Sequence, residues 1–124
     1  MDTREKIVSI DAVPALLVTG EWTVVAGLFD PLTLAQAQRV AATAEAGRRT
    51  LVVVIPDPDT LLPAQARAAL MAALRDVDAV VIADPEQISG PGRRVHEDAA
   101  AERERSAEFV RFVLRRKRSA EIRV

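Results

Sequence analysis

One turn of this chain has the residue types that hold phosphate groups in many proteins with parallel sheets. In such sheets ligands lie beyond the carboxyl ends of the strands, where amides at a helix N-terminus point toward a phosphate. The turn is Gly27-Leu28-Phe29-Asp30-Pro31. Gly27 permits close backbone approach, Asp30 can accept hydrogen bonds from the first helical amides, and Pro31 suits the first helical position. The same residues also describe a capped helix start that binds nothing, so both interpretations stay open.

Other kinds of catalytic site are limited by residue type. The chain has no cysteine and one histidine, which excludes a thiolate nucleophile, Cys-rich zinc sites and paired-histidine metal sites. We expect the single histidine, His96, to be a surface residue near a helix start, because no nucleophile neighbours it in sequence. Asp57 and Asp59 can ligate a divalent cation in principle, but Pro-Asp-Pro-Asp is ordinary turn chemistry. We predict no metal site.

Short apolar runs rich in β-branched residues predict the strands that position this turn. Strands buried on both faces of a parallel sheet have this pattern, and it occurs at Trp22–Gly27, Leu51–Ile55 and Ala79–Ala83. Helical spacing predicts helices at Leu32–Ala46, stopped by Gly47, and at Pro63–Arg75. The predicted buried positions of the two helices are Ala37, Val40, Ala41 and Ala44, and Ala66, Leu70, Ala73 and Leu74.

The alternation of strands and helices predicts an α/β fold with right-handed crossovers: a Rossmann-like, three-layer α/β/α domain with a short parallel sheet. Before the first strand we expect a short extended piece at Lys6–Ile10 and a helical turn at Val13–Val18. After a break at Gly90-Pro91-Gly92, we predict one long C-terminal helix over Glu97–Arg118. We expect residues 1–124 to form a single domain, with its core at 6–84 and a helical extension at 97–118.

Composition and charge limit the class of function. Of the 124 residues 49% are hydrophobic, 17 basic residues nearly balance 18 acidic ones, and only 3% are aromatic, so nucleic-acid binding is not indicated. No run reaches the roughly 18 apolar residues that span a bilayer. The start MDTREKIVSIDAVPALLVTG mixes acids with bases, unlike a secretory signal. We expect a soluble, cytoplasmic protein without a membrane segment.

Charge is divided unevenly along the chain. Residues 93–118 carry nine bases against five acids, a net of +4, and residues 1–92 carry seven against twelve, a net of −5. The basic segment can dock on the acidic remainder, on a second copy or on a polyanion, although Arg115-Arg116-Lys117-Arg118 is also typical of a helix C-terminus. We predict a homodimer contact through the C-terminal helix, with completion of the domain's own core as the alternative.

Two motifs resemble those of the cytidylyltransferase-like nucleotidyltransferases. They are G-x-F-D at Gly27–Asp30 and R-x-x-x-x-x-A-L-R-x-V-D-x-V-V at Arg67–Val81, supported by Lys6-Ile7-Val8-Ser9, Trp22–Gly27 and Leu32. Within that superfamily the chain looks most like the adenylyltransferase domains that act on heptose 1-phosphate in bacterial lipopolysaccharide-precursor synthesis, over about residues 6–84. The resemblance implies attack of a sugar phosphate on the α-phosphorus of ATP or CTP, with Mg²⁺ and release of pyrophosphate.

The chain departs from this family where the family's charge-bearing residues lie. The resemblance implies an H-x-G-H motif after G-x-F-D, but the positions read Thr33-Leu34-Ala35-Gln36, and neither Thr33 nor Gln36 can carry a positive charge. Loss of one preorganised donor costs about 10²–10³ in turnover. Where relatives have lysine and arginine, the loop Pro56–Leu62 has two acids and no base. Nothing after Asp84 matches well, although Ile88–Arg94 is interpretable as a remnant of the family's nucleotide-closing turn, with Ser89 and Arg93 as phosphate ligands.

Two functions remain open on this sequence. The first is a pseudoenzyme with a degenerate H-x-G-H motif that works by binding a nucleotide or phosphate ligand, a protein partner or a second copy of itself. The second is an active adenylyl- or cytidylyltransferase that uses Thr33, Gln36 and an arginine such as Arg93 or Arg94. In either case the candidate nucleotide- or phosphate-binding residues are Gly27, Leu28, Phe29, Asp30, Thr33 and Gln36, with Ser89 and Arg93 as additional candidates.

Overall fold

A parallel sheet forms the centre of the molecule. A computed structural model describes residues 2–30, 32–44, 47–88, 93–96 and 114–116, with 93–96 described through the backbone. The five strands lie in the order β1-β4-β3-β2-β5, and every pairing is parallel. The strands are β1 (Ile7–Val8), β2 (Trp22–Gly27), β3 (Arg49–Val54), β4 (Ala79–Ile82) and β5 (Arg93–His96).

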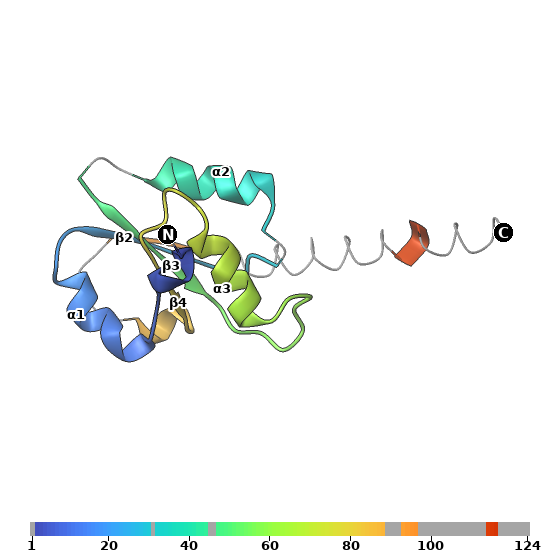
Figure 1. The fold of residues 1–124 in the computed structure, drawn as a ribbon, viewed down its shortest axis with the longest axis horizontal. Coiled ribbons are helices and arrows are strands. Elements are labelled where there is room, and N and C mark those ends of the chain that lie inside the picture. Colours follow the sequence, from blue (N-terminus) through green and yellow to red (C-terminus); the bar gives the residue numbers. More distant parts are fainter. Residues whose placement is uncertain (1, 31, 45–46, 89–92, 97–113, 117–124) are drawn as a thin grey trace.

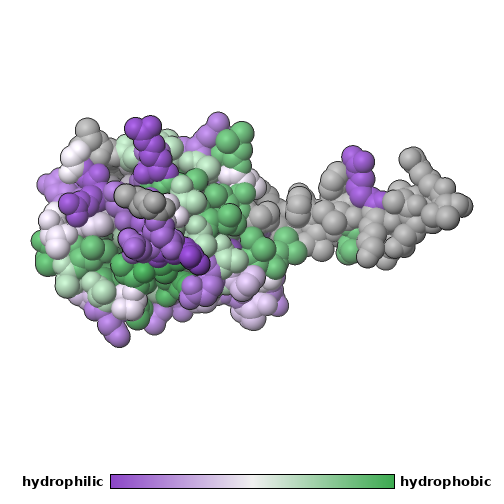
Figure 2. Space-filling view, viewed as in Figure 1, coloured by the Kyte–Doolittle hydropathy of each residue, from purple (hydrophilic) through white to green (hydrophobic). Residues whose placement is uncertain are grey.

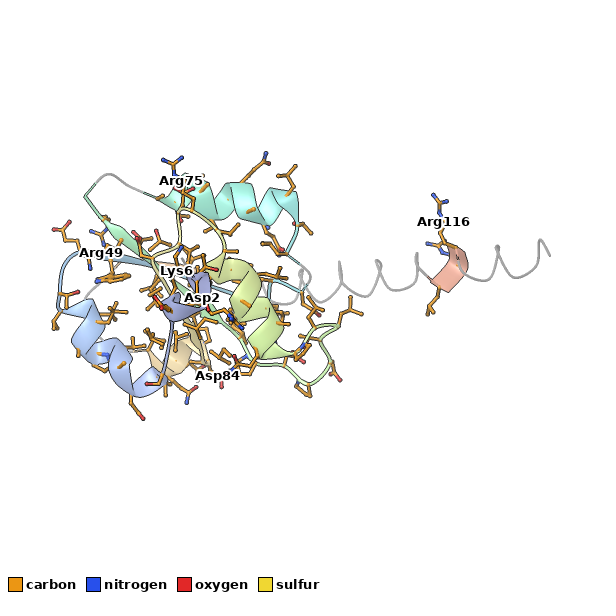
Figure 3. The ribbon with its side chains drawn as sticks, in the orientation of Figure 1. Asp2, Lys6, Arg49, Arg75, Asp84 and Arg116 are labelled. Carbon is orange, nitrogen blue, oxygen red and sulfur yellow. The ribbon has the colours of Figure 1, made fainter. Side chains whose placement is uncertain are left out.

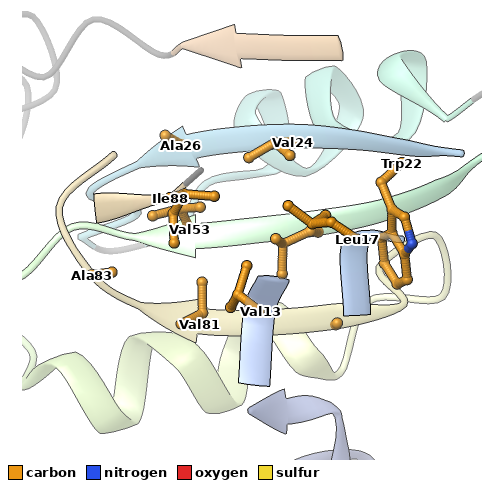
Figure 4. Packing of buried hydrophobic residues seen from close by; sticks show 11 residues of the cluster. Val13, Leu17, Trp22, Val24, Ala26, Val53, Val81, Ala83 and Ile88 are labelled. Carbon is orange, nitrogen blue, oxygen red and sulfur yellow. The ribbon is translucent and has the colours of Figure 1, made fainter. Parts of the chain in front are cut away.

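Helices cover both faces of the sheet (Figure 1). Helix α1 (Val13–Leu17) packs on one face, where Val13 and Leu17 join one buried cluster with Val24 and Val53. Figure 4 shows this packing, with Ile88 lying over the same face. Helices α2 (Leu34–Thr43) and α3 (Ala64–Ala72) contribute to the opposite cluster. The described part is therefore α/β with a parallel sheet between helices, an arrangement compatible with a Rossmann-like fold.

The strands predicted from β-branched runs are confirmed, with small differences at their ends. β2 spans Trp22–Gly27 as predicted, and all six of its residues are buried. β3 starts at Arg49 and ends at Val54, one residue before the predicted end, and β4 ends at Ile82. The extended piece near the N-terminus and the short helix that follows it are also present, as β1 and α1.

The C-terminal part differs from its prediction. Arg93–His96 form strand β5, which lies parallel to β2, so His96 is the last residue of a strand, and the residues that directly follow it lie outside the described part. A long helix over Glu97–Arg118 is not shown: three residues of it, Leu114–Arg116, are described and are helical, and the rest lies outside the described residues. β5 has one apolar residue, Val95, so its sequence lacks the pattern of a buried strand.

Helix α2 is shorter than predicted, because its N-cap is Thr33. The predicted helix began at Leu32, but it begins at Leu34 and ends at Thr43. The buried side chains of α2 are Gln36 and Val40, whereas the predicted core positions Ala41 and Ala44 are exposed. Gly47 has a positive φ of 83° and lies in the turn that leads to β3, after the helix has already ended.

Helix α3 turns a different face inward than predicted. The helix begins at Ala64 after Pro63, and its buried residues are Arg67, Ala68, Met71 and Ala72. Leu70, which we predicted to be buried, exposes 43% of its surface. The helix is mostly alanine, so its sequence gives a weak amphipathic signal, and the aliphatic part of an arginine can occupy an interior position.

The N-terminal residues are tied to the end of α3. The Nζ of Lys6 donates a hydrogen bond to the carbonyl oxygen of Leu74 at 3.1 Å. Lys6 closes a 3-10 turn (Thr3–Lys6), and two further such turns lie at Ile10–Ala12 and Pro85–Gln87. In the first turn, hydrogen bonds from the exposed Arg4 lower the pKa of Asp2.

Candidate functional site

The strand order creates one topological switch point, between β2 and β5. From β2 the chain proceeds through β3 to β4 on one side, and β5 returns to the other side of β2. Ligands of open parallel sheets bind at such a point, beyond the carboxyl ends of the strands. Ala26 pairs with His96 and Gly27 pairs with Val54, so the predicted phosphate turn lies at this point.

The residues of this turn are mostly directed into the fold. Leu28 and Phe29 are 1% and 0% exposed, Asp30 and Gln36 are each 4% exposed, and Thr33 is exposed. The amide of Ile55 donates to the carbonyl oxygen of Gly27 at 2.9 Å, which ties the turn to the end of β3. Pro31 lies outside the described residues. Among the six turn residues predicted to bind, only Thr33 therefore exposes a side chain.

Phe29 anchors the turn through its buried ring. Its φ is +53°, a left-handed conformation that costs a non-glycine residue about 1–3 kcal/mol. The ring lies in the core cluster that contains Val40 and Met71, and full burial of such a side chain contributes about 1.5–3 kcal/mol. Burial of the ring thus offsets the backbone strain and fixes the course of the turn.

Asp30 does not cap helix α2, which corrects the interpretation given above. Its carboxylate accepts hydrogen bonds from the backbone amides of Leu61 and Leu62, the latter at 2.8 Å. These amides lie in the loop between β3 and α3, so Asp30 joins two loops that are distant in sequence. A carboxylate that accepts two backbone amides is held by charge-assisted bonds, which are stronger than neutral ones.

Arg67 makes a second connection between the same loops. Its guanidinium group is 1% exposed, and Nη1 donates to the carbonyl oxygens of Leu28 and Ile55 at 2.8 Å each. Its Nε donates to the carbonyl oxygen of Leu62 at 3.1 Å. Sequence analysis recognised Arg67 only as part of a motif, because a single arginine in an alanine-rich helix does not reveal which carbonyls it will meet. Asp30 and Arg67 together form what we call the loop brace.

Thr33 and Gln36 form a capping box at the start of α2. The Thr33 hydroxyl oxygen accepts from the Gln36 amide at 3.2 Å, and the Gln36 Oε1 accepts from the Thr33 amide at 3.1 Å. The side chains at the two positions where the resembled family has histidines thus accept hydrogen bonds from backbone amides at the start of α2. The Thr33 hydroxyl hydrogen can still donate outward, since a hydroxyl both accepts and donates.

The loops at this edge are acidic. We call Leu28–Thr33, Ile55–Pro63 and Ala83–Ile88, the segments that follow β2, β3 and β4, the carboxyl edge. These segments contain no lysine, arginine or histidine, and their five acids are Asp30, Asp57, Asp59, Asp84 and Glu86. Within the described residues no group of three acidic or histidine side chains is arranged to hold a metal ion.

The opposite end of the sheet gathers arginines around the only tryptophan, Trp22. Arg48 donates to the Trp22 carbonyl oxygen and, through Nε, to the Thr23 hydroxyl at 3.2 Å. The guanidinium carbon of Arg49, a residue labelled in Figure 3, lies 5.8 Å from the centroid of the Trp22 ring. The indole Nε1 is buried and has no hydrogen-bond partner within the described part of the chain.

The backbone positions of the remaining candidates are described only for strand β5. Arg93 pairs with Thr23 and Arg94 with Val24, so both begin β5 at the end of the sheet opposite to the turn. The strand carries His96 to the switch point beside Ala26, a placement that sequence analysis missed. Ser89 lies outside the described residues, and the side chains of Arg93–His96 are not described.

The chain matches no protein-family model and no curated protein. Within the described residues no helix is both long and apolar enough to cross a membrane.

Proposed function

We propose that this chain is a nucleotidyltransferase-like pseudoenzyme that works by binding and transfers no nucleotidyl group. The proposal rests on one observation: the polar groups of the first turn are used within the fold. Asp30 accepts from the amides of the β3–α3 loop, and Gln36 completes the capping box with Thr33. The Asp30 carboxylate and the Gln36 Oε1 are both acceptors held by backbone amides, and neither brings positive charge to a transferring phosphoryl group.

The charge at the carboxyl edge supports the same proposal. Transfer to a phosphate acceptor requires cationic groups around the reacting phosphorus. The carboxyl-edge segments contain five acids and no base. Arg67 reaches this edge from α3, but it is buried and donates to three backbone carbonyls. Acids at the carboxyl edge favour a cationic partner, so a basic protein segment is the first candidate for the bound partner.

A nucleotide or sugar phosphate is the second candidate for the bound partner. It is supported by the switch point between β2 and β5 and by the N-terminus of α2, with the exposed Thr33 as a possible donor. Binding there would be weak, because no described cation faces the site.

A transfer assay tests the proposal directly. The full chain is incubated with ATP or CTP, Mg²⁺ and heptose 1-phosphate, and pyrophosphate release is compared with a protein-free blank. We expect no release above the blank. Release that disappears in Gln36→Ala would establish the active-enzyme alternative and overturn the proposal. Calorimetric titration with ATP and with CTP, in parallel, decides whether a nucleotide is bound without being transferred.

A gain-of-function test addresses the charge argument. The triple variant Thr33→His, Ala35→Gly, Gln36→His restores the family's motif, yet we expect no turnover, because Pro56–Leu62 still supplies no cation. The variant also loses the capping box, so its folding is checked by circular dichroism. Measurable product from a folded triple variant would show that the missing histidines alone explain the loss.

A further inference from the structure

A shallow pocket beside the β3–α3 loop is outside the predicted nucleotide site. Its volume is about 560 Å³. Its walls are largely apolar and include the rings of Pro56, Pro58 and Pro63 and the side chain of Leu61. Leu61 exposes 47% of its surface. Asp57 and Arg67 also line it. Pockets of this volume with a few polar groups commonly bind ligands or side chains.

Hydrogen bonds hold the pocket wall in place before any partner arrives. Asp30 accepts from the Leu61 and Leu62 amides. The Thr60 hydroxyl shares its one hydrogen between the carbonyl oxygens of Asp57 and Leu62, at 3.0 and 2.9 Å. A surface that is already ordered loses little conformational entropy on binding. The pocket is therefore suited to receive an apolar side chain.

The charge around the pocket restricts that partner. Asp57 lines the pocket, and Asp59 lies between two of its lining residues, Pro58 and Thr60. The neighbouring carboxyl-edge segments add acids and no base. An apolar side chain flanked by cations fits this surface, and an anionic ligand does not.

The chain itself contains such a segment. Leu114–Arg116 form a helical turn in which all three residues are exposed, and Leu114 exposes 50% of its surface. Figures 1 and 3 show this turn, with Arg116 labelled, standing apart from the sheet and its helices. Figure 2 shows both hydrophobic and hydrophilic surface on it. Residues 93–118 carry a net charge of +4 against −5 for residues 1–92, so the two parts are complementary.

We propose that Leu114–Arg116 of one copy docks on the proline-lined pocket of a second copy. Leu114 enters the pocket, and Arg115 lies near the carboxylate of Asp59. A reciprocal exchange of this kind places two identical contacts about one twofold axis. The inference rests on the proposed function. That function is to bind a partner without transferring a nucleotidyl group, and the inference names a second copy as the partner.

Self-association of the full chain tests the inference. Size-exclusion chromatography with light scattering, over a range of concentrations, is expected to show a dimer that weakens as salt is raised. We expect Leu114→Ala and Arg115→Glu each to raise the dimer dissociation constant by at least ~10-fold. Leu70→Ala and Arg75→Glu are matched controls, because both residues are exposed on the body of the domain, and these should leave the constant unchanged.

A charge exchange identifies the contact itself. Asp59→Lys should weaken the dimer, and combining it with Arg115→Glu should restore much of the lost affinity. A chain that is monomeric at all concentrations, or a dimer that responds to the controls as much as to Leu114→Ala, would overturn the inference. Docking within one copy would also give a monomer and would likewise overturn the inference. Transfer activity would refute the proposed function but would leave the light-scattering result intact, so the two failures are distinguishable.

Discussion

The two ends of the sheet differ in both charge and construction. The carboxyl edge has five acids and no base in its segments. We define the amino edge as the first two residues of each of strands β2 to β5 and the four residues before them, and it has five arginines and four acids. The amino-edge arginines are Arg48, Arg49, Arg75, Arg93 and Arg94, and the acids are Glu21, Glu45, Asp76 and Asp78. At the carboxyl edge Asp30 and Arg67 are buried while Asp59, Asp84 and Glu86 are exposed. At the amino edge Arg49 and Arg75 are exposed.

This difference supports the proposed function, in which a parallel sheet keeps its architecture without the chemistry of its usual ligand edge. A phosphate site needs cations and open donors at the carboxyl edge. Here the cations lie mainly at the other end, and the donors and acceptors of the first turn hold loops together. The loop brace makes the carboxyl edge a rigid surface, in keeping with a docking role. The following four variants test whether the two edges differ as described.

The largest effect is expected for Arg67→Met. Removing the buried guanidinium leaves the carbonyl oxygens of Leu28, Ile55 and Leu62 without their donor, so we expect the free energy of unfolding to fall by about 3–5 kcal/mol. Urea denaturation monitored by circular dichroism measures this free energy. Arg75→Met is the control, because Arg75 is exposed. A loss below about 1 kcal/mol would mean that the brace does not stabilise the edge.

A smaller loss is expected for Asp30→Ala, which removes the other half of the brace. The amides of Leu61 and Leu62 lose a charged acceptor, at a cost of about 2–3 kcal/mol. Hydrogen exchange should become faster at these two amides while amides in β3 keep their protection. Unchanged exchange at Leu61 and Leu62 would contradict the assigned contact.

Much of the fold could be predicted from the sequence, because β2, β3 and β4 are dense runs of β-branched residues. β5 could not be predicted, because Arg93-Arg94-Val95-His96 has only one apolar residue. It forms a strand by pairing with the side of β2 that β3 leaves open. The binding roles of the first turn stay predictions, but the contacts that its side chains make within the fold could not be read from the sequence. Asp30 finds its partners 31 and 32 residues away, and a sequence pattern encodes no contact of that length.

Thr33→Ala probes the end of α2 and should have a moderate effect. Loss of an N-cap hydroxyl costs about 1 kcal/mol, and Thr33→Ser, which keeps the hydroxyl, should cost much less. Thermal unfolding of the unchanged chain and of the alanine and serine variants compares their stabilities. Equal stability of the alanine and serine variants would show that the capping box contributes nothing measurable.

The smallest effect is expected at the amino edge, for Arg49→Ala. An exposed cation near an aromatic face contributes about 0.5–1 kcal/mol, and Arg49→Lys should retain part of it. Because Trp22 is the only tryptophan, its fluorescence reports this edge alone. A loss as large as that of Asp30→Ala would mean that the amino edge is braced as strongly as the carboxyl edge.

The pairing of β1 sets the order in which the sheet can be completed during synthesis. β1 leaves the ribosome first, yet its residues Ile7 and Val8 pair with Val80 and Val81. The hydrogen bond from Lys6 likewise needs the carbonyl oxygen of Leu74, which is made much later. The earliest strand to be made therefore remains without its neighbour until about seventy further residues have been added. Until then its backbone edge is open, and a nascent chain halted before β4 would present that edge to chaperones or to other chains.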